Sequence, residues 1–224
     1  MPDVLTAQPT PRSRRTLSEA RNAVARSLNV KGANWLTDAD LTFMLNDGQD
    51  EVARISRWYR AGWQGGTTAS TAQIDLPAAP LARFLAVEEV YPDDQPLLQI
   101  RFELLQEYYR RFRTQSAADP RWWAANGGSA LYLYPTPSAT EADILKVYGQ
   151  ALPPYVSQDE DKLYVPHGLE NAILDFARLQ VCLKDAPGEG ARRLPWYAGR
   201  WENYWVSEIQ RVTAGVNPED VTAM

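Results

Sequence analysis

Few side chains in this sequence have the type and the spacing that catalysis requires. The chain has one histidine, His167, and one cysteine, Cys182. These counts exclude an HExxH site, any two-histidine metal site, an internal disulfide and multi-cysteine zinc or iron–sulfur sites. His167 follows a proline at an expected helix start, with no nucleophile or orienting acid signalled nearby, so we interpret it as a capping or surface residue. Cys182 falls near the apolar side of an expected helix and is interpreted as a buried, inert thiol.

Phosphate binding and glycoside hydrolysis have weak support. The segment Gly62-Trp-Gln-Gly-Gly66 lacks the lysine and the following hydroxyl of a P-loop, and no GxSxG, GxGxxG or EF-hand pattern occurs. A glycosidase needs a pair of carboxylates, and the acidic clusters are Asp38, Asp40, Glu88, Glu89, Asp159 and Glu160. The first two suit the N-terminus of a helix, and the others suit a solvated strand or loop. We therefore expect no catalytic residue, no metal site and no cofactor.

Aromatic residues are the unusual part of the composition. The chain has eight Trp and eleven Tyr but only five Phe, and rings with a polar group suit half-buried surfaces and interfaces. Stacking of bases or sugars is an open alternative, because Trp58 and Tyr59, and likewise Tyr108 and Tyr109, are flanked by arginines. Both pairs lie on expected helices whose inner face needs the rings, which favours core packing or subunit contact. The residues expected to contact other subunits are Trp122, Trp123, Trp196, Trp201, Arg12, Arg14 and Arg15.

Charge and hydropathy exclude several classes of protein. With 45% hydrophobic and 23% charged residues, the chain is too apolar to be disordered. No apolar run approaches the roughly 18 residues of a membrane helix, and the N-terminus lacks the apolar stretch of a secretory signal. The net charge is −5, but the first 31 residues carry six basic and two acidic side chains, so the remainder carries −9. Such an acidic body argues against a broad face that grips nucleic acid.

Amphipathic periodicity predicts helices toward both ends of the chain. The capping box Thr16-Leu-Ser-Glu19 predicts a helix over about 17–29. Thr37 is the expected N-cap of a longer helix to about Arg60, whose inner face holds Leu45, Val52 and Ile55. Further helices are expected over about 101–113, from Pro166 to Lys184, over about 195–213, and after Asn217.

Alternating polar and apolar residues predict strands in the middle of the chain, at about 72–76, 83–91, 130–134 and 142–149. The last two are expected to form a hairpin around Pro135-Thr-Pro137. Gly62–Gly66 is interpreted as a breaker, and 119–123 and 126–128 as loop. The predicted fold is α+β: a mainly helical bundle in one domain over 17–213, with a small antiparallel insertion at about 71–149. An extended arm at 1–16 and a C-terminal tail at 214–224 complete it.

Four stretches between about Trp35 and Arg211 carry a resemblance to a known protein family. They are Trp35-Leu-Thr-Asp-Ala-Asp-Leu with its following helix, Phe84-Leu-Ala-Val-Glu-Glu-Val-Tyr, Leu131-Tyr-Leu-Tyr-Pro-Thr-Pro leading to a strand that ends in Val147-Tyr-Gly, and Leu163-Tyr-Val-Pro-His-Gly-Leu-Glu. In this arrangement the chain resembles phage head–tail adaptor (connector) proteins, which form the ring below the portal of tailed phages. The arm at 1–15 and the Trp-rich segment at 196–205 lie outside the resemblance.

The resemblance implies a structural protein without catalysis, located in the virion at the head–tail interface and assembled in the host cytoplasm. It implies a ring, commonly of twelve copies, that joins the portal to a tail or stopper protein, with double-stranded DNA passing through the lumen without sequence-specific binding and with no membrane partner. C-terminal docking on the portal would map to about 206–224, with Ile209, Val212, Val216, Val221 and Met224 as contacts. An aromatic-rich carbohydrate- or nucleic-acid-binding module is the alternative function.

Overall fold

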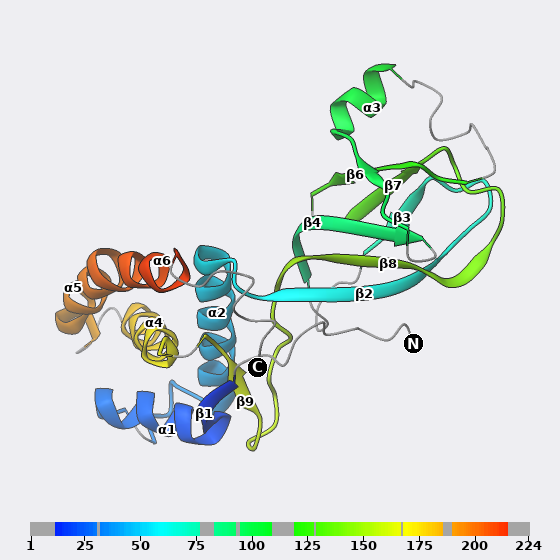
Figure 1. Ribbon diagram of the computed structural model, residues 1–224. Coiled ribbons are helices and arrows are strands. Elements are labelled where there is room, and N and C mark those ends of the chain that lie inside the picture. The colour runs from blue at the N-terminus through cyan, green and yellow to red at the C-terminus, as the bar shows by residue number, and fades with distance from the viewer. Residues whose placement is uncertain are drawn as a thin grey trace. The chain divides into compact units, whose positions relative to one another are not determined.

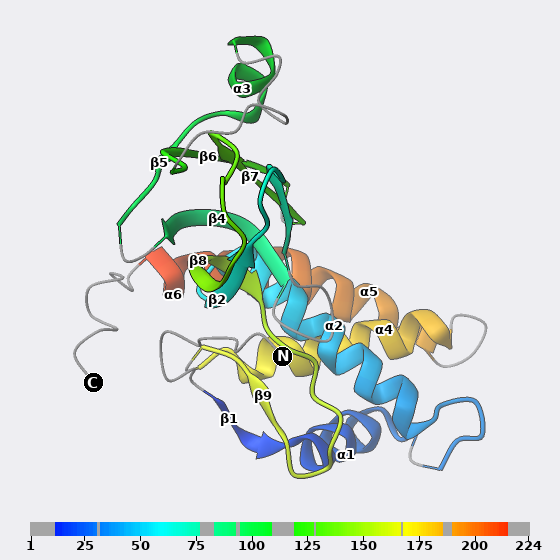
Figure 2. The ribbon, with the colours of Figure 1, turned by 90° about the vertical axis from the view of Figure 1, so that its right-hand side faces the viewer.

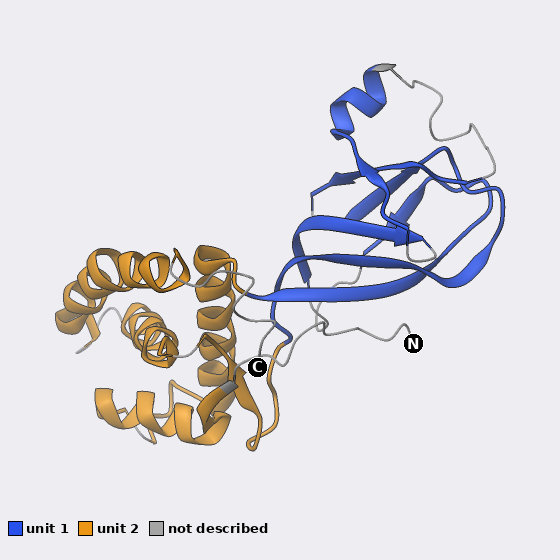
Figure 3. Cartoon of the chain, in the orientation of Figure 1, with its two compact units in different colours: residues 1–9, 59–154 blue, residues 10–58, 155–224 orange. Residues whose placement is uncertain are grey.

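The computed structural model describes residues 12–30, 32–76, 83–92, 95–108, 119–127, 129–166, 168–185 and 190–214. The chain forms two compact units (Figure 3). We call the unit that contains residues 59–154 the β unit. The unit that contains residues 10–58 and 155–224 is called the helical unit. The β unit is therefore inserted between two stretches of the helical unit. In the described parts of the chain, no helix combines the length and hydropathy needed to cross a bilayer.

The helical unit is organised around one central helix (Figure 1). Its elements are α1 (Leu17–Leu28), α2 (Asp38–Ser56), α4 (Glu170–Lys184), α5 (Gly190–Arg200), the π-helical turn η1 (Trp201–Trp205) and α6 (Val206–Ala214). The central helix α4 packs against α1, α2, α5 and η1. Because apolar residues recur along α4 at helical spacing, its buried faces join these neighbours into one core. The largest fully buried side chains of this core are Leu17, Leu45, Leu163, Leu169, Ile173 and Leu174.

The first two helices begin as their sequences predict. In α1 the Thr16 hydroxyl accepts from the Glu19 N–H and the Glu19 carboxylate accepts from the Thr16 N–H; Thr37 and Asp40 make the same reciprocal pair in α2. Helix α2 ends at Ser56 rather than near residue 60, because the next residue adopts a left-handed backbone conformation (φ 52°). Leu45 and Val52 are buried, as expected, whereas Ile55, expected on the same inner face, is only partly buried against that core.

Three further features of the helical unit differ from the sequence prediction. Strand β1 (Arg12–Thr16) pairs antiparallel with β9 (Lys162–Tyr164), so the end of the expected arm is held by its own chain (Figure 2). Helix α4 starts at Glu170 instead of Pro166. The expected helix over 195–213 begins earlier, at Gly190, and is interrupted by η1. His167 and the segment after Asn217 lie outside the described residues.

The described residues of the β unit form two sheets and one short helix. Its elements are β2 (Arg60–Thr67), β3 (Gln73–Asp75), β4 (Arg83–Pro92), β5 (Leu98–Gln99), α3 (Phe102–Tyr108), β6 (Trp122–Asn126), β7 (Ala130–Tyr134) and β8 (Glu141–Leu152). One sheet has the order β2-β8-β4 and the other has the order β3-β7-β6-β5. All pairs are antiparallel except β5 with β6. The chain is thus of mixed helix and strand content, and its strands form a whole unit rather than a small insertion in a mainly helical bundle.

The glycine-rich segment Gly62–Gly66 is part of strand β2 and does not interrupt the secondary structure, although the sequence predicts an interruption there. Gly62 lies opposite Tyr148 and Gly65 lies opposite Leu145 of β8. A Cβ on Gly65 would come within 2.2 Å of the Trp63 ring, and one on Gly149 would come within 2.1 Å of the Ala86 carbonyl oxygen. Glycine here makes room for close neighbours, a role that a local pattern does not distinguish from a turn.

Two further predictions in the β unit were wrong. The sequence predicts loop at Trp122, Trp123 and Asn126. These residues instead belong to strand β6, which pairs with β7 along its whole length. The strands β7 and β8 do not form a hairpin, because they belong to different sheets. Strand β8 has β2 on one edge and β4 on the other, so it has no edge left for β7. The expected helix over 101–113 is described only to Tyr108.

Candidate functional site

One face of α5 and η1 presents aromatic and basic side chains to solvent. Trp196 is 56% exposed and Tyr204 is 52% exposed, although both are large and apolar enough to favour burial. With Arg192 and Arg200 they recur every fourth residue, which places them along one side of a helix. The π-helical turn at 201–205 has more residues per turn than an α-helix. Residues 200 and 204 therefore stay on the same side of the helix. We call these four residues the α5–η1 strip.

A buried carboxylate fixes the middle of the strip from below. Asp175 on α4 is 1% exposed. Its Oδ2 accepts from Arg200 Nε at 2.8 Å and from Trp205 Nε1 at 2.8 Å. Its Oδ1 accepts from a terminal guanidinium nitrogen of Arg178 at 2.5 Å. Because a buried charge is stable only when it is paired and hydrogen-bonded, Asp175 holds Arg200 in one place on the surface.

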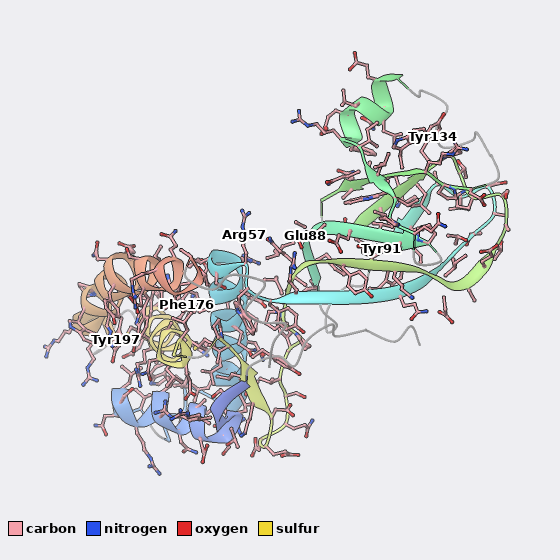
Figure 4. All side chains as sticks on the ribbon, viewed as in Figure 1. Arg57, Glu88, Tyr91, Tyr134, Phe176 and Tyr197 are labelled. Atoms are coloured by element: carbon pink, nitrogen blue, oxygen red, sulfur yellow. The ribbon has the colours of Figure 1, made fainter. Side chains whose placement is uncertain are left out.

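Ring contacts order the exposed aromatics. The guanidinium carbon of Arg200 lies 5.1 Å from the centroid of the Trp196 ring and 5.8 Å from that of Trp205, within cation–π range. Tyr204 packs edge-on against Trp205, with centroids 4.8 Å apart. Trp196 packs the same way on the buried Tyr197, which Figure 4 labels on the helical unit. Exposed rings that are ordered in advance lose little side-chain entropy when a partner covers them.

The arrangement has the composition of a protein-binding hot spot. Trp, Tyr and Arg are the residues enriched where truncation costs most binding energy. In the described part of the chain, no group of three His, Cys, Asp or Glu side chains converges as a metal site would require. The β unit has an open hollow of about 540 Å³, whose mixed lining includes Pro92, Pro120 and Pro137 together with the charged residues Asp119, Arg121 and Glu141. The α5–η1 strip is therefore the best-defined candidate site, and its side chains are suited to binding another protein surface.

Comparison with known families decides the class of protein. The sequence model of the SU10 adaptor protein family matches residues 15–218, which covers nearly all of both units. This chain belongs to the SU10 adaptor protein family. The family is one of phage adaptors, so this chain is a structural component of a virion, and proteins of this family are typically not enzymes. No curated protein matches the sequence.

Of the tryptophans expected at subunit contacts, the structure leaves one well exposed. Trp196 lies on the α5–η1 strip. Trp201 is 7% exposed and packs edge-on against Phe176 in the core, and Trp123 is 1% exposed inside the β unit. Trp122 is partly buried and stacks on Tyr134, with centroids 5.7 Å apart. The expectation is corrected for Trp123 and Trp201, because their positions face the interior of their own units.

The arginines of the expected N-terminal arm lie against their own chain. Arg15 forms an ion pair with Glu170 at 3.2 Å, and the Arg14 backbone N–H donates to the same carboxylate at 3.1 Å. Arg12 lies opposite Tyr164 in the β1–β9 pair. A neighbouring chain is therefore not needed to hold residues 12–16, although the sequence-based expectation places Arg12, Arg14 and Arg15 at contacts with other subunits. Residues 1–11 lie outside the described chain.

Two of the five residues expected to contact the portal lie within the described chain. Ile209 is fully buried and belongs to the core of the helical unit, so in this structure it is a packing residue and not a surface contact. Val212 is partly buried against the same core. Val216, Val221 and Met224 lie outside the described residues.

Four members of the site were not predicted from the sequence: Asp175, Arg192, Arg200 and Tyr204. The four-residue spacing from Arg192 to Tyr204 was a usable signal, because it places two rings and two arginines on one side of a helix. A carboxylate at 175, within an otherwise apolar helix face, was a second signal that a buried partner exists. Which partners it has depends on the packing of α4 against η1 and could not be derived locally.

Proposed function

We propose that this chain is a head–tail adaptor of a tailed phage, assembling into a ring that joins the portal to a tail or stopper protein. The observation that carries the proposal is the α5–η1 strip on a member of a phage adaptor family. An adaptor must hold proteins together permanently, and large permanent interfaces use exposed apolar and aromatic surface. Twelve copies is the number that the resemblance to phage connectors implies.

The charge distribution supports passage of double-stranded DNA through such a ring. Outside the first 31 residues the chain carries −9. Affinity for DNA rises with the number of cationic side chains that neutralise phosphates. An acidic body therefore limits attraction to DNA, which suits a conduit that must not hold what passes through it.

We further propose that the segment from about 206 to the C-terminus docks on the portal. Helix α6 ends the described helical unit at Ala214, and Val216, Val221 and Met224 follow it in the sequence. Apolar residues at such spacing next to Asn217-Pro-Glu-Asp suit a short helix laid into a groove of a partner. Because Ile209 is buried in its own unit, the proposed contact is carried by the residues beyond α6, with Val212 at its edge.

A binding module for sugars or single-stranded nucleic acid is the second candidate. The observation that favours it is the exposed pair of rings at Trp196 and Tyr204 with Arg200 between them. Stacking platforms combine such rings with arginines. The two candidates differ in whether the rings are covered by protein or by a ligand.

Particle mass and electron microscopy separate the two. The purified 25.2 kDa chain, alone and mixed with portal rings, is expected to form a ring of about 300 kDa under twelvefold symmetry. Images should then show that ring coaxial with the portal. Monomers in both conditions, together with saturable binding of an oligosaccharide or an oligonucleotide that Trp196→Ala abolishes, would replace the adaptor proposal with the binding module.

A further inference from the structure

A second exposed patch lies on α2, in the same helical unit. Phe43 is 67% exposed, the highest value among the large hydrophobic side chains that the structure describes as exposed. Asp47 and Glu51 follow it at intervals of four residues, so the three side chains lie along one side of α2. Tyr155, which is 40% exposed, donates its hydroxyl to Asp50 Oδ2 at 3.2 Å on the same stretch of helix. We call Phe43, Asp47 and Glu51 the α2 patch.

The α2 patch is acidic. Asp47, Asp50 and Glu51 lie within two turns of helix, and Arg54 is the one basic residue of the same segment from 38 to 56. Desolvation of Asp47, and next the charge of Asp50, raise the pKa of Asp47, while Arg54 opposes them. An arriving cation would relieve that repulsion. The environment of α2 therefore favours a partner that brings positive charge.

The α5–η1 strip has the opposite charge. Arg178 and Arg200 both pair with the single buried carboxylate of Asp175, and Arg192 adds a further positive charge on α5, which leaves an excess of positive charge. Glu202 is the one acidic residue within α5 and η1, and it lies beside the strip. Each surface thus has exposed aromatic area combined with charge, and the charges are complementary.

The two surfaces belong to different helices of one unit. Helix α4 packs against both α2 and α5 and lies between them (Figure 1). A copy of the chain therefore offers the strip on one helix and the patch on another. Two strips facing each other would place arginines against arginines, which opposes a symmetric dimer through this surface.

We propose that the α5–η1 strip of one copy packs on the α2 patch of the next copy, head to tail. This inference rests on the proposed function and specifies how the ring is held. Arginines 192 and 200 would face the acidic residues of α2, and the rings at 196 and 204 would cover Phe43. Because every copy carries both surfaces, the contact repeats from copy to copy and ends when the ring closes.

Complementation of two variants tests the pairing. Variant one, Arg192→Glu with Trp196→Ala, loses the strip but keeps the patch. Variant two, Phe43→Ala with Asp47→Lys, loses the patch but keeps the strip. Because the altered side chains are exposed or partly exposed, both should retain the wild-type circular dichroism spectrum. The control is Glu103→Ala with Gln106→Ala, which changes exposed residues of α3 outside both surfaces and outside the proposed docking segment.

Oligomer mass at high protein concentration, with wild type measured in parallel, gives the result. Each variant alone should be monomeric, whereas the mixture should form dimers and nothing larger, with the control behaving as wild type. Dimers of a single variant would show a symmetric contact, and wild-type assembly by both variants would place the contact elsewhere; either overturns the inference. If wild type forms no ring even with portal, the proposed function itself fails.

Cross-linking traps contacts between copies even when they are too short-lived to give a stable ring. With a short bis-maleimide, Ala39→Cys, one turn from Phe43, combined with Ser207→Cys, one turn from Tyr204, should give a ladder of cross-linked oligomers, while each single variant should stay monomeric; both altered residues are exposed and lie outside the strip and the patch. The native Cys182 is buried, and burial raises the pKa of its thiol, so it should not react. Absence of the ladder in the double variant, or self-linking of a single variant, would overturn the head-to-tail pairing.

Discussion

Trp205 donates its indole N–H to Asp175 Oδ2 at 2.8 Å in the interior of the helical unit. The two residues lie 30 positions apart, on η1 and α4. This bond ties the π-helical turn to the central helix, and the same oxygen accepts from Arg200 on the surface. The exposed α5–η1 strip is therefore positioned by a group that solvent hardly reaches, and its geometry should depend on that group.

Replacing Asp175 by Asn should destabilise the helical unit. The change removes the negative charge that pairs with Arg178 and Arg200. Removing one partner of a buried ion pair costs about 3–5 kcal/mol, and because both arginines are partly exposed the loss should fall at or below the lower end of that range. Urea unfolding measures it. The control, Glu208→Gln, breaks the exposed pair with Arg211 and should lower the free energy of unfolding much less, because solvent screens exposed ion pairs. Equal losses in both variants would contradict the anchoring role.

Replacing Trp205 by Phe should act through the same bond. The ring is kept but the indole N–H is lost, which leaves one acceptor position of Asp175 unsatisfied and costs about 1–3 kcal/mol. Combined with Asp175→Asn in a double-mutant cycle, the two losses should be less than additive, because they remove one shared interaction. Strictly additive losses would show that Trp205 stabilises the unit by packing alone.

The inner face of α2 should respond to truncation far more than its outer face. Leu45 is fully buried in the core, so Leu45→Ala should lower the free energy of unfolding by about 2–5 kcal/mol. Phe43, two residues earlier, is 67% exposed, and Phe43→Ala should lie within about 0.5 kcal/mol of wild type. Thermal unfolding of the isolated chain measures both. Similar melting temperatures for the two variants would mean that the faces are assigned wrongly.

The glycine at the centre of β8 should not tolerate a methyl group. In Gly149→Ala the new Cβ would lie 2.1 Å from the Ala86 carbonyl oxygen, so the β4–β8 pair must shift. We expect a loss of at least about 1 kcal/mol, the scale of overpacking. In the control, Gly199→Ala, the Cβ meets only the Asn203 amide, at 3.8 Å, within helix α5, and a gain of about 0.5–1 kcal/mol is expected. Urea unfolding that shows no difference would contradict the close approach.

Asp40 should make stability dependent on pH in the acidic range. The hydrogen bond from Lys184, followed by those within the Thr37 cap, holds the pKa of Asp40 well below its ordinary 3.8. A lowered folded-state pKa contributes stability above the unfolded pKa that is lost as the pH falls toward the folded value. Wild type should therefore exceed Asp40→Asn in stability at neutral pH, and the difference should shrink as the pH drops below about 4. A difference that is constant with pH would assign the effect to the cap geometry alone.

Deleting 215–224 should separate folding from docking. Every described helix of the helical unit ends at or before Ala214, so the truncated chain should keep the wild-type unfolding transition. It should fail to attach to portal-bearing, DNA-filled heads, which a sedimentation assay measures. Normal attachment would refute C-terminal docking, and loss of folding would show that these residues belong to the core.

Local patterns in the sequence were enough to predict what depends on near neighbours. The capping boxes at Thr16 and Thr37, and the buried side of α2, follow from spacings within about one or two turns of helix. The strand at 130–134 follows from a short apolar run. The sequence alone also indicated a phage adaptor, because that likeness is spread over most of the chain and needs no contacts to be seen.

Tertiary structure decided everything that depends on residues far apart in the chain. Glycine stands within the strands at positions 65 and 149 because the Trp63 ring and the Ala86 carbonyl fill the space that a Cβ would need. Strand β7 avoids β8 because β2 and β4 already occupy both edges of β8. Trp201 is buried while Trp196 is exposed, although both are tryptophans of one helical segment, because α4 covers only one side of it. Side-chain type specifies what a residue can do, but burial and partners are set by which elements pack together, and that is a property of the whole chain.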